Sequence, residues 1–155
     1  MAGDQERDAV TESRETSRDA LAALLVTALV DTNIVKAVIG HKPTKEDVKN
    51  RSPLVAVVSV GRARPRFTTQ ENRATFRFDV QLWVLIADGV AWTPAIAEDR
   101  LDLMEATVAE VVAVNQETDD WNCLIAEDDS VIGDVGYDGV PYVVEHLPVT
   151  VEVFK

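Results

Sequence analysis

The clearest pattern in this chain is the alternation of apolar and polar residues in "ATFRFDVQLWVLI", residues 74–86. Successive side chains of a β-strand point to opposite faces, so one face of this strand is apolar. That face carries Phe76, Phe78, Val80, Leu82 and Val84. The other face begins with the polar residues Arg77, Asp79 and Gln81. It ends with Trp83 and Leu85, and we therefore expect its far end to be covered as well.

A second strand is predicted at residues 54–60, "LVAVVSV", which are apolar on both faces. This composition is typical of a buried strand. We predict that the two strands pair as an antiparallel hairpin, joined by a link across residues 61–73. The link is longer than an ordinary hairpin loop, and links of this length are usually functional or disordered.

The first helix is predicted to follow a polar segment, residues 1–16, which we interpret as a flexible N-terminal segment or the frayed start of the helix. Thr16 or Ser17 is the expected N-cap, and the poor helix formers from Asp31 onward should end the helix. Its apolar residues recur at helical spacing, at Leu21, Leu24, Leu25, Ala28 and Leu29. Residues 17–155 are then expected to form a single domain.

The second helix is predicted to begin with Thr93 as N-cap and Pro94 at the first helical position. It should end near Asn115. Its apolar stripe, expected to lie across the sheet, consists of Ala97, Leu101, Met104, Val108, Val111 and Val112.

The segments between these elements carry weaker signals. Residues 34–40 could form a short strand or a last helical turn, and residues 41–53 are interpreted as a loop because they show no apolar face. Residues 116–130 are interpreted as an acidic connector, anchored by Trp121 and Ile125.

The last third of the chain returns to strands. Asp138-Gly139 is a turn signal between them, and the closing segment alternates through Val149, Val151 and Val153. Pro148 lacks an N–H group and therefore indicates an edge position or a bulge. The predicted fold is α+β, with a mixed, largely antiparallel sheet flanked on one side by two helices, in the order α-β-β-α-β-β.

Charge is unevenly distributed along the 155 residues, whose formal net charge is -12. Residues 36–77 hold 10 basic and 3 acidic side chains, whereas residues 78–155 hold 2 basic and 17 acidic ones. Such segregation can give the folded protein faces of opposite sign, which favour head-to-tail contacts between copies. The alternative is that the two blocks intermix once the chain folds.

Few residues offer catalytic chemistry. His41 and His146 stand apart in the sequence, and a nucleophilic pair of Cys123 with His146 is conceivable, although a lone buried cysteine is commoner. The segment "GDVGYDG" lacks the lysine of a phosphate-binding loop. We therefore expect no enzyme, no catalytic residue and no cofactor.

Metal binding is the next alternative. Glu127, Asp128 and Asp129, or Asp134 with Asp138, could hold a hard cation. Neither group has the spacing of an EF-hand, so we interpret them as solvated acidic loops and expect no metal.

The cellular location also follows from composition. A single cysteine excludes an intrachain disulfide and fits a reducing compartment. The charged N-terminus lacks the apolar core of a signal peptide, and the apolar run at residues 20–30 is too short to cross a bilayer. We expect a soluble protein made inside the cell, with no membrane contact.

The basic residues around the predicted hairpin link are the most informative candidates for binding. They are Arg62, Arg64, Arg66, Arg73 and Arg77, with Phe67 among them. A nucleic-acid site is one interpretation, but an acidic body repels phosphate over roughly 8–10 Å. We favour contacts with another subunit or a partner protein, because arginine forms bidentate pairs with carboxylates. The candidate acidic partners are Glu98, Asp102, Glu105, Glu127, Asp128 and Asp129.

The order of elements resembles a known family. A first helix leads into "SPLVAVVSVG", a long hairpin link and "FRFDVQLWVLI", followed by the amphipathic "AEDRLDLMEATVAEVVAVN" and a closing "GVPYVVEHLPVTVEVF". From about residue 17 to residue 154, this chain is similar to the tail terminator, or tail completion, proteins of long-tailed bacteriophages. The resemblance rests on element order and on the closing hydrophobic-Pro-Val-x-Val strand, not on a catalytic signature.

The resemblance implies a structural virion protein at the tail–neck junction, assembled in the host cytoplasm. Such a protein would form a hexameric ring, cap the tail tube protein and join it to the head–tail connector protein. The arginines would then face a neighbouring subunit, the tube or the lumen, where they could contact passing DNA without sequence preference. Two other interpretations stay open: another head–tail connector or minor capsid protein, and a single-stranded nucleic-acid-binding module that uses the arginines and Phe67.

Overall fold

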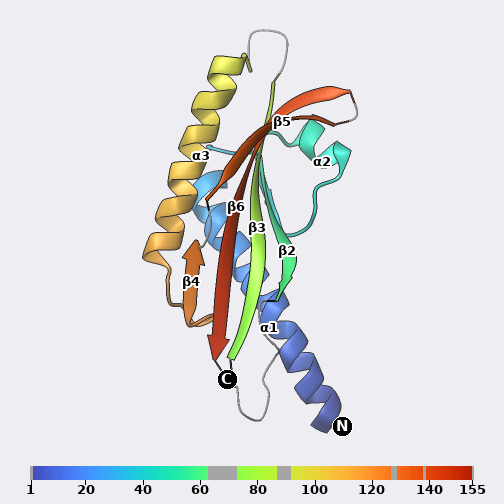
Figure 1. Cartoon of the computed structure of the whole chain (residues 1–155), viewed down its shortest axis with the longest axis vertical. Coiled ribbons are helices and arrows are strands. Elements are labelled where there is room, and N and C mark those ends of the chain that lie inside the picture. The colour runs from blue at the N-terminus through green and yellow to red at the C-terminus, as the bar shows by residue number, and fades with distance from the viewer. Residues whose placement is uncertain (1, 63–72, 87–91, 127–128, 138, 155) are drawn as a thin grey trace.

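The structure is a computed structural model that describes residues 2–62, 73–86, 92–126, 129–137 and 139–154 (Figure 1). Within these ranges, the side chains of residues 2–13, 73 and 154 are not described. The helices are α1 (Ala2–Leu25), which continues as the π-helical turn η1 (Val26–Val30), α2 (Lys45–Asn50) and α3 (Pro94–Val114). The strands are β1 (Ala37–Ile39), β2 (Leu54–Arg62), β3 (Arg73–Leu85), β4 (Cys123–Ala126), β5 (Val131–Tyr137) and β6 (Val140–Phe154). The α+β class predicted from the sequence is confirmed.

The described strands form one six-stranded sheet in the order β1-β2-β3-β6-β4, and β5 pairs with the first part of β6. Only the β1–β2 pair is parallel, so the sheet is mixed and largely antiparallel. The predicted hairpin is confirmed by the antiparallel pairing of β2 with β3, in which Leu54 lies opposite Trp83. The long strands β3 and β6 form the centre of the sheet, with Phe76 opposite Val151.

One face of the sheet packs against α1 and α3, which both lie on this side (Figure 1). The predicted apolar faces of β3 and α3 meet here: Phe76, Phe78 and Leu101 are at most 1% exposed. Thr93 caps α3 as predicted, since its hydroxyl oxygen accepts a hydrogen bond from the Ile96 N–H at 3.3 Å. Two long helices therefore flank one side of the sheet, as the sequence predicted.

The opposite face is covered only in part. A second apolar cluster there joins Val48 of α2 to residues of β1, β2, β3 and β6. Trp83 is its centre, with the rings of Tyr142 and Tyr137 packed edge-on at 5.7 and 5.8 Å between centroids. The expectation that the far end of this face is covered is thus confirmed, and α2 with the β5–β6 hairpin supplies the cover.

Several local predictions need correction. The first helix begins at Ala2, so an N-cap at Thr16 or Ser17 is wrong, while the flexibility expected for residues 1–16 stays a prediction. The loop predicted for residues 41–53 contains α2, because Thr44 and Asp47 form a capping box that starts a helix.

Two further segments adopt strands. The undecided residues 34–40 contain β1. The connector at residues 116–130 contains β4, in which Leu124 is buried. Trp121 is an anchor, as predicted, but Ile125 is 41% exposed, so its prediction as an anchor is wrong.

Two turn and edge predictions are confirmed. Tyr137 pairs with Val140, which leaves a two-residue turn in which Gly139 has a φ of +78°. Asp138 lies outside the described residues. On one side of β6, His146 is the last residue that pairs with β5 and Val149 is the first that pairs with β4. Pro148 lies between these two residues. Its missing N–H group therefore costs no ladder hydrogen bond on that side of the strand.

Candidate functional site

The side of the molecule formed by β1 and α2 is basic. Residues 36–51 carry five basic and two acidic side chains. All five basic side chains are exposed, and we call them the basic edge: Lys36, Lys42, Lys45, Lys49 and Arg51. Of these, Arg51 lies 3.8 Å from the Asp47 carboxylate.

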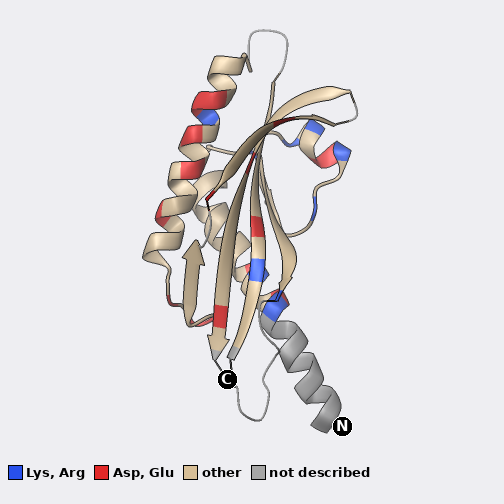
Figure 2. Ribbon diagram, viewed as in Figure 1, with Lys and Arg blue, Asp and Glu red and all other residues tan. Residues whose placement is uncertain are grey.

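The side of the sheet covered by α3 is acidic, and the first part of β5 borders it. Residues 94–137 carry twelve acidic side chains and one basic one. Five exposed carboxylates of α3 and β5 define what we call the acidic side: Glu98, Asp99, Asp102, Glu110 and Asp134. Figure 2 shows the red positions of α3 at one side of the sheet and the blue positions of α2 at the other. The basic side chains of residues 36–51 and the acidic side chains of α3 therefore lie on different sides of the sheet after folding.

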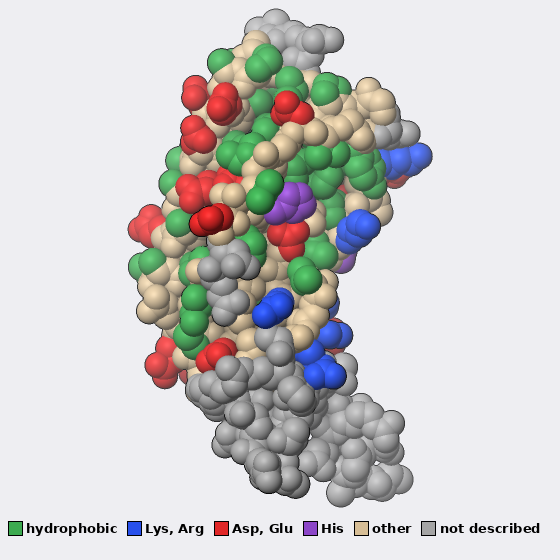
Figure 3. All heavy atoms as spheres, in the orientation of Figure 1, with side chains coloured by type: hydrophobic (Ala, Val, Ile, Leu, Met, Phe, Trp, Pro, Cys, Tyr) green, Lys and Arg blue, Asp and Glu red, His purple; other side chains and the backbone are tan. Residues whose placement is uncertain are grey.

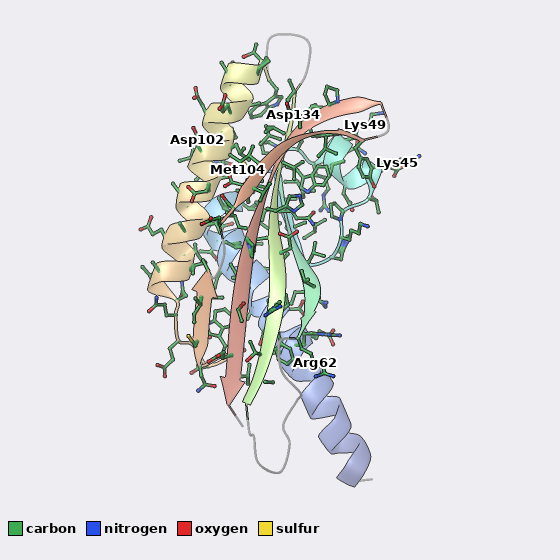
Figure 4. The ribbon with its side chains drawn as sticks, viewed as in Figure 1. Lys45, Lys49, Arg62, Asp102, Met104 and Asp134 are labelled. Atoms are coloured by element: carbon green, nitrogen blue, oxygen red, sulfur yellow. The ribbon has the colours of Figure 1, made fainter. Side chains whose placement is uncertain are left out.

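The predicted arginines are only partly described. Arg77 is exposed on the face of β3 that turns away from the long helices, and it makes no ion pair among the described residues. Arg62 is exposed at the end of β2, where Figure 4 labels it. Arg73 pairs opposite Phe154 through its backbone. Arg64, Arg66 and Phe67 lie outside the described residues.

The predicted acidic partners that the structure describes lie on α3 and just before β5. Glu98 and Asp102 are exposed on α3 and Glu105 is half-buried there. Asp129 is exposed before β5, while Glu127 and Asp128 lie outside the described residues. Arg77 lies on one face of the sheet and α3 covers the other, so the structure does not bring Arg77 together with the α3 carboxylates in one subunit.

A buried carboxyl group, Glu145, was missed by the sequence-based prediction. It is 3% exposed and lies on the helix-covered face of β6, opposite Leu82. Burial raises its pKa above the ordinary value of 4.5; a hydrogen bond with Ser130 opposes the rise, and the nearby carboxylates of Glu105 and Asp102 add to it. The signal was present in the sequence, because Glu145 occupies an apolar position of the alternation that continues through Val143 and Leu147.

A row of hydrogen-bonded side chains crosses the other face of the sheet. The Trp83 indole donates to Gln81 at 3.1 Å, and the Gln81 amide donates to Asp79 at 3.0 Å. The same Asp79 oxygen lies 2.7 Å from Nδ1 of His146. On the face that Figure 3 shows, a histidine side chain lies next to a carboxylate side chain. The row ends beside a cavity of about 480 Å³ lined by Val60, Arg77, Phe78, Asp79, Pro148, Val149 and Thr150.

The described cavity lining places no nucleophilic side chain beside the Asp79–His146 pair. The nearest hydroxyl in the cavity lining is that of Thr150. It stands four residues from His146 on the same strand, roughly 13 Å away at 3.3–3.4 Å per residue. Cys123 lies opposite Glu152, still further from His146 along β6. Burial and the charge of Glu152 also raise the pKa of the Cys123 thiol, which disfavours the reactive thiolate. A nucleophilic pair of Cys123 with His146 is therefore excluded.

A second hollow lies on the acidic side, between β5 and the start of α3. It has a volume of about 410 Å³ and is lined by Ile86, Pro94, Glu98, Leu101, Ile132, Asp134 and Val143. Its floor is apolar, and its two charged side chains are carboxylates, so the hollow suits a basic partner with an aliphatic stem, such as lysine or arginine.

Comparison with known proteins assigns no family. No protein-family model matches the sequence, and no match is found among curated proteins. Within the described ranges, no cluster of three or more histidine, cysteine, aspartate or glutamate side chains is arranged to hold a metal ion. None of the described helices is both long and apolar enough to cross a membrane.

Proposed function

We propose that this protein is a structural subunit of a bacteriophage tail. It assembles with copies of itself into a closed ring, expected to be hexameric, that caps the tail tube and joins it to the head–tail connector at the tail–neck junction. The proposal begins from the resemblance in element order to tail terminator proteins.

The observation that carries the proposal is the separation of charge in the fold. The basic edge and the acidic side lie on opposite sides of one sheet (Figure 2), so two copies can meet only head to tail if unlike charges are to face each other. Head-to-tail contacts use two different surfaces on each subunit, and they close into a ring when the rotation per subunit fits.

Arg77 and Arg62 suit a second contact in such a ring. Both are exposed and lie away from the acidic side, where a tube subunit, a neighbouring subunit or the phosphates of passing DNA could meet them. A contact with phosphate would be independent of sequence and sensitive to salt. The proposal therefore assigns these arginines to subunit or tube contact first and to DNA second.

The first test is native mass measured over a range of protein concentration at low and high salt. We expect a discrete closed oligomer, six chains for the hexameric ring, whose formation weakens as salt screens the charged contacts. A chain that stays monomeric with and without the tail tube, and that retains single-stranded DNA, would contradict the ring and favour the nucleic-acid-binding module.

A second test reverses the charge of two arginines in the hairpin link, Arg64→Glu with Arg66→Glu. Assembly should weaken, while the thermal midpoint of the monomer should change little, because the sequence assigns these arginines to contacts with other subunits and surface substitutions usually alter stability by less than about 0.5 kcal/mol. Loss of DNA retention with assembly intact would favour the nucleic-acid-binding module. A large fall in the monomer midpoint would show that these arginines make contacts within the subunit.

A further inference from the structure

The outer edge of β5 is an open strand edge. Among the described strands, β5 pairs with β6 alone, so the opposite row of its backbone N–H and C=O groups meets no other strand. Proteins usually protect such edges with lysine, proline or a bulge, because an open edge can pair with another chain. The seven residues of β5, "VIGDVGY", include no lysine and no proline. Its edge is thus open to strand addition.

Two glycines in β5 have no explanation within the subunit. The φ angles of Gly133 and Gly136 lie outside the left-handed region, so neither conformation requires glycine. A Cβ atom built on either residue would meet nothing within 4 Å. Glycine weakens a strand interior, and it often marks a place where another backbone approaches closely. The space beside these glycines is therefore suited to a partner chain.

Two neighbouring apolar side chains at this edge are also exposed. Val131 and Ile132 are 64% and 57% exposed. Ile132 lines the hollow of about 410 Å³ next to Glu98 and Asp134. Exposed apolar side chains rimmed by charge are typical of interaction sites. The two carboxylates select a basic partner.

The basic edge of a second copy meets these requirements. Pairing of β5 with β5 of another copy would bring two sets of carboxylates together, including Asp134 and Glu98, which is unfavourable. The strand at the other end of the sheet, β1, pairs only with β2 among the described strands, and exposed Lys36 and Lys42 flank it. A contact of β5 with this end would join an acidic surface to a basic one.

We infer that the β5 edge of one copy pairs with the β1 edge of the next copy, so that the sheet continues from subunit to subunit. In this contact Gly133 and Gly136 leave room on the two faces of β5 for the neighbouring subunit, and the lysines of the basic edge meet Glu98 and Asp134. The inference rests on the proposed ring, for which it names the subunit interface.

Glycine replacement tests the edge directly. Gly133→Val should leave the thermal midpoint of the subunit unchanged or slightly higher, because the added side chain meets open space and valine favours a strand. It should weaken assembly, because a strand side chain projects from the face of the sheet and would fill the space that elements flanking β1 of the next copy would occupy. The matched control is Gly139→Val in the β5–β6 turn, where a φ of +78° makes valine strained, so this variant should lower the midpoint.

Charge reversal tests the choice of partner. Variant A carries Glu98→Lys with Asp134→Lys, and variant B carries Lys36→Glu with Lys42→Glu. Each alone should associate at least about tenfold more weakly than the wild type, because like charges then face each other. An equal mixture of A and B should regain assembly, since every interface then joins unlike charges. Asp119→Lys with Asp120→Lys has the same charge change as variant A, lies outside the proposed contact and should assemble normally.

Hydrogen exchange supplies the structural readout. Amides of residues 131–137 should exchange at least about tenfold more slowly in the wild-type oligomer than in monomeric Gly133→Val, while amides of β3 should be unchanged. A wild-type oligomer that persists in Gly133→Val and in variants A and B would overturn the edge contact but leave the ring in place. An open-ended polymer with protected β5 amides would support the edge contact and contradict the ring. A wild type that never self-associates would overturn the edge contact.

Discussion

The two faces of the central strands β3 and β6 differ in what covers them, although both faces belong to the same strands. On the helix-covered face, Phe76, Phe78 and Val80 are at most 1% exposed beneath α1 and α3. On the other face, Arg77 is exposed and Asp79 is partly exposed. The comparison indicates that one face determines the fold, whereas the lower part of the other face is available for contacts with partners.

The largest expected effect comes from comparing two adjacent residues of β3. Phe78→Ala should cost about 3–5 kcal/mol of unfolding free energy, because it removes a buried ring and leaves a cavity. Arg77→Ala, one residue away on the other face, should cost less than about 0.5 kcal/mol. Urea unfolding followed by tryptophan fluorescence measures both. Similar losses for the two variants would show that the two faces contribute equally to the fold.

A smaller effect is expected at Glu145, a carboxyl residue on the otherwise apolar helix-covered face. Because burial raises its pKa in the folded state above 4.5, the fold favours the protonated carboxyl. At a pH below the pKa of the unfolded state, Glu145 is protonated in both the folded and the unfolded state and causes no loss of stability. As pH rises through the folded pKa, the wild type loses stability.

Glu145→Gln removes this ionisation. The variant should therefore match the wild type in thermal midpoint near pH 4 and exceed it at pH 7, by less than the effect of Phe78→Ala. Thermal unfolding of both proteins at several pH values measures the difference. If the variant is less stable than the wild type at pH 7, the charged form of Glu145 is stabilised within the fold, and the assigned direction is wrong.

The sequence predicted the elements with long periodic patterns and missed the short ones. Residues of α3 and β3 repeat their spacing over many positions, so their type and their buried faces could be assigned correctly. In contrast, α2 and β4 each bury a single apolar side chain, Val48 and Leu124, which gives no measurable period. Their positions depend on contacts with residues distant in the sequence.

The candidate site was less predictable than the fold. The charge blocks were visible in the sequence, but their placement on opposite sides of the sheet follows from the strand order, which puts β1 and β5 at opposite ends. The unexplained glycines of β5 could be recognised only once the space around them was known. Arg64, Arg66 and Phe67 stay predictions, because they lie outside the described residues.

The smallest expected effect concerns the polar row on the face away from the long helices. The Asp79–His146 pair is short, at 2.7 Å, but the two side chains are 21% and 43% exposed, so solvent screens their interaction. Exposed pairs contribute about 0.2–1 kcal/mol. His146→Ala should therefore lower the unfolding free energy by about 0.5 kcal/mol, and the double variant with Asp79→Asn should lower it by little more, because the two residues share one interaction.

A double-mutant cycle, measured by urea unfolding of the two single variants and the double variant, determines this coupling energy. A coupling near that of a buried pair, about 3 kcal/mol, would mean that the row stabilises the fold as strongly as a core contact. The division between a face that determines the fold and a face open to partners would then be wrong. A small coupling together with weakened assembly of His146→Ala would instead place this row within a contact surface.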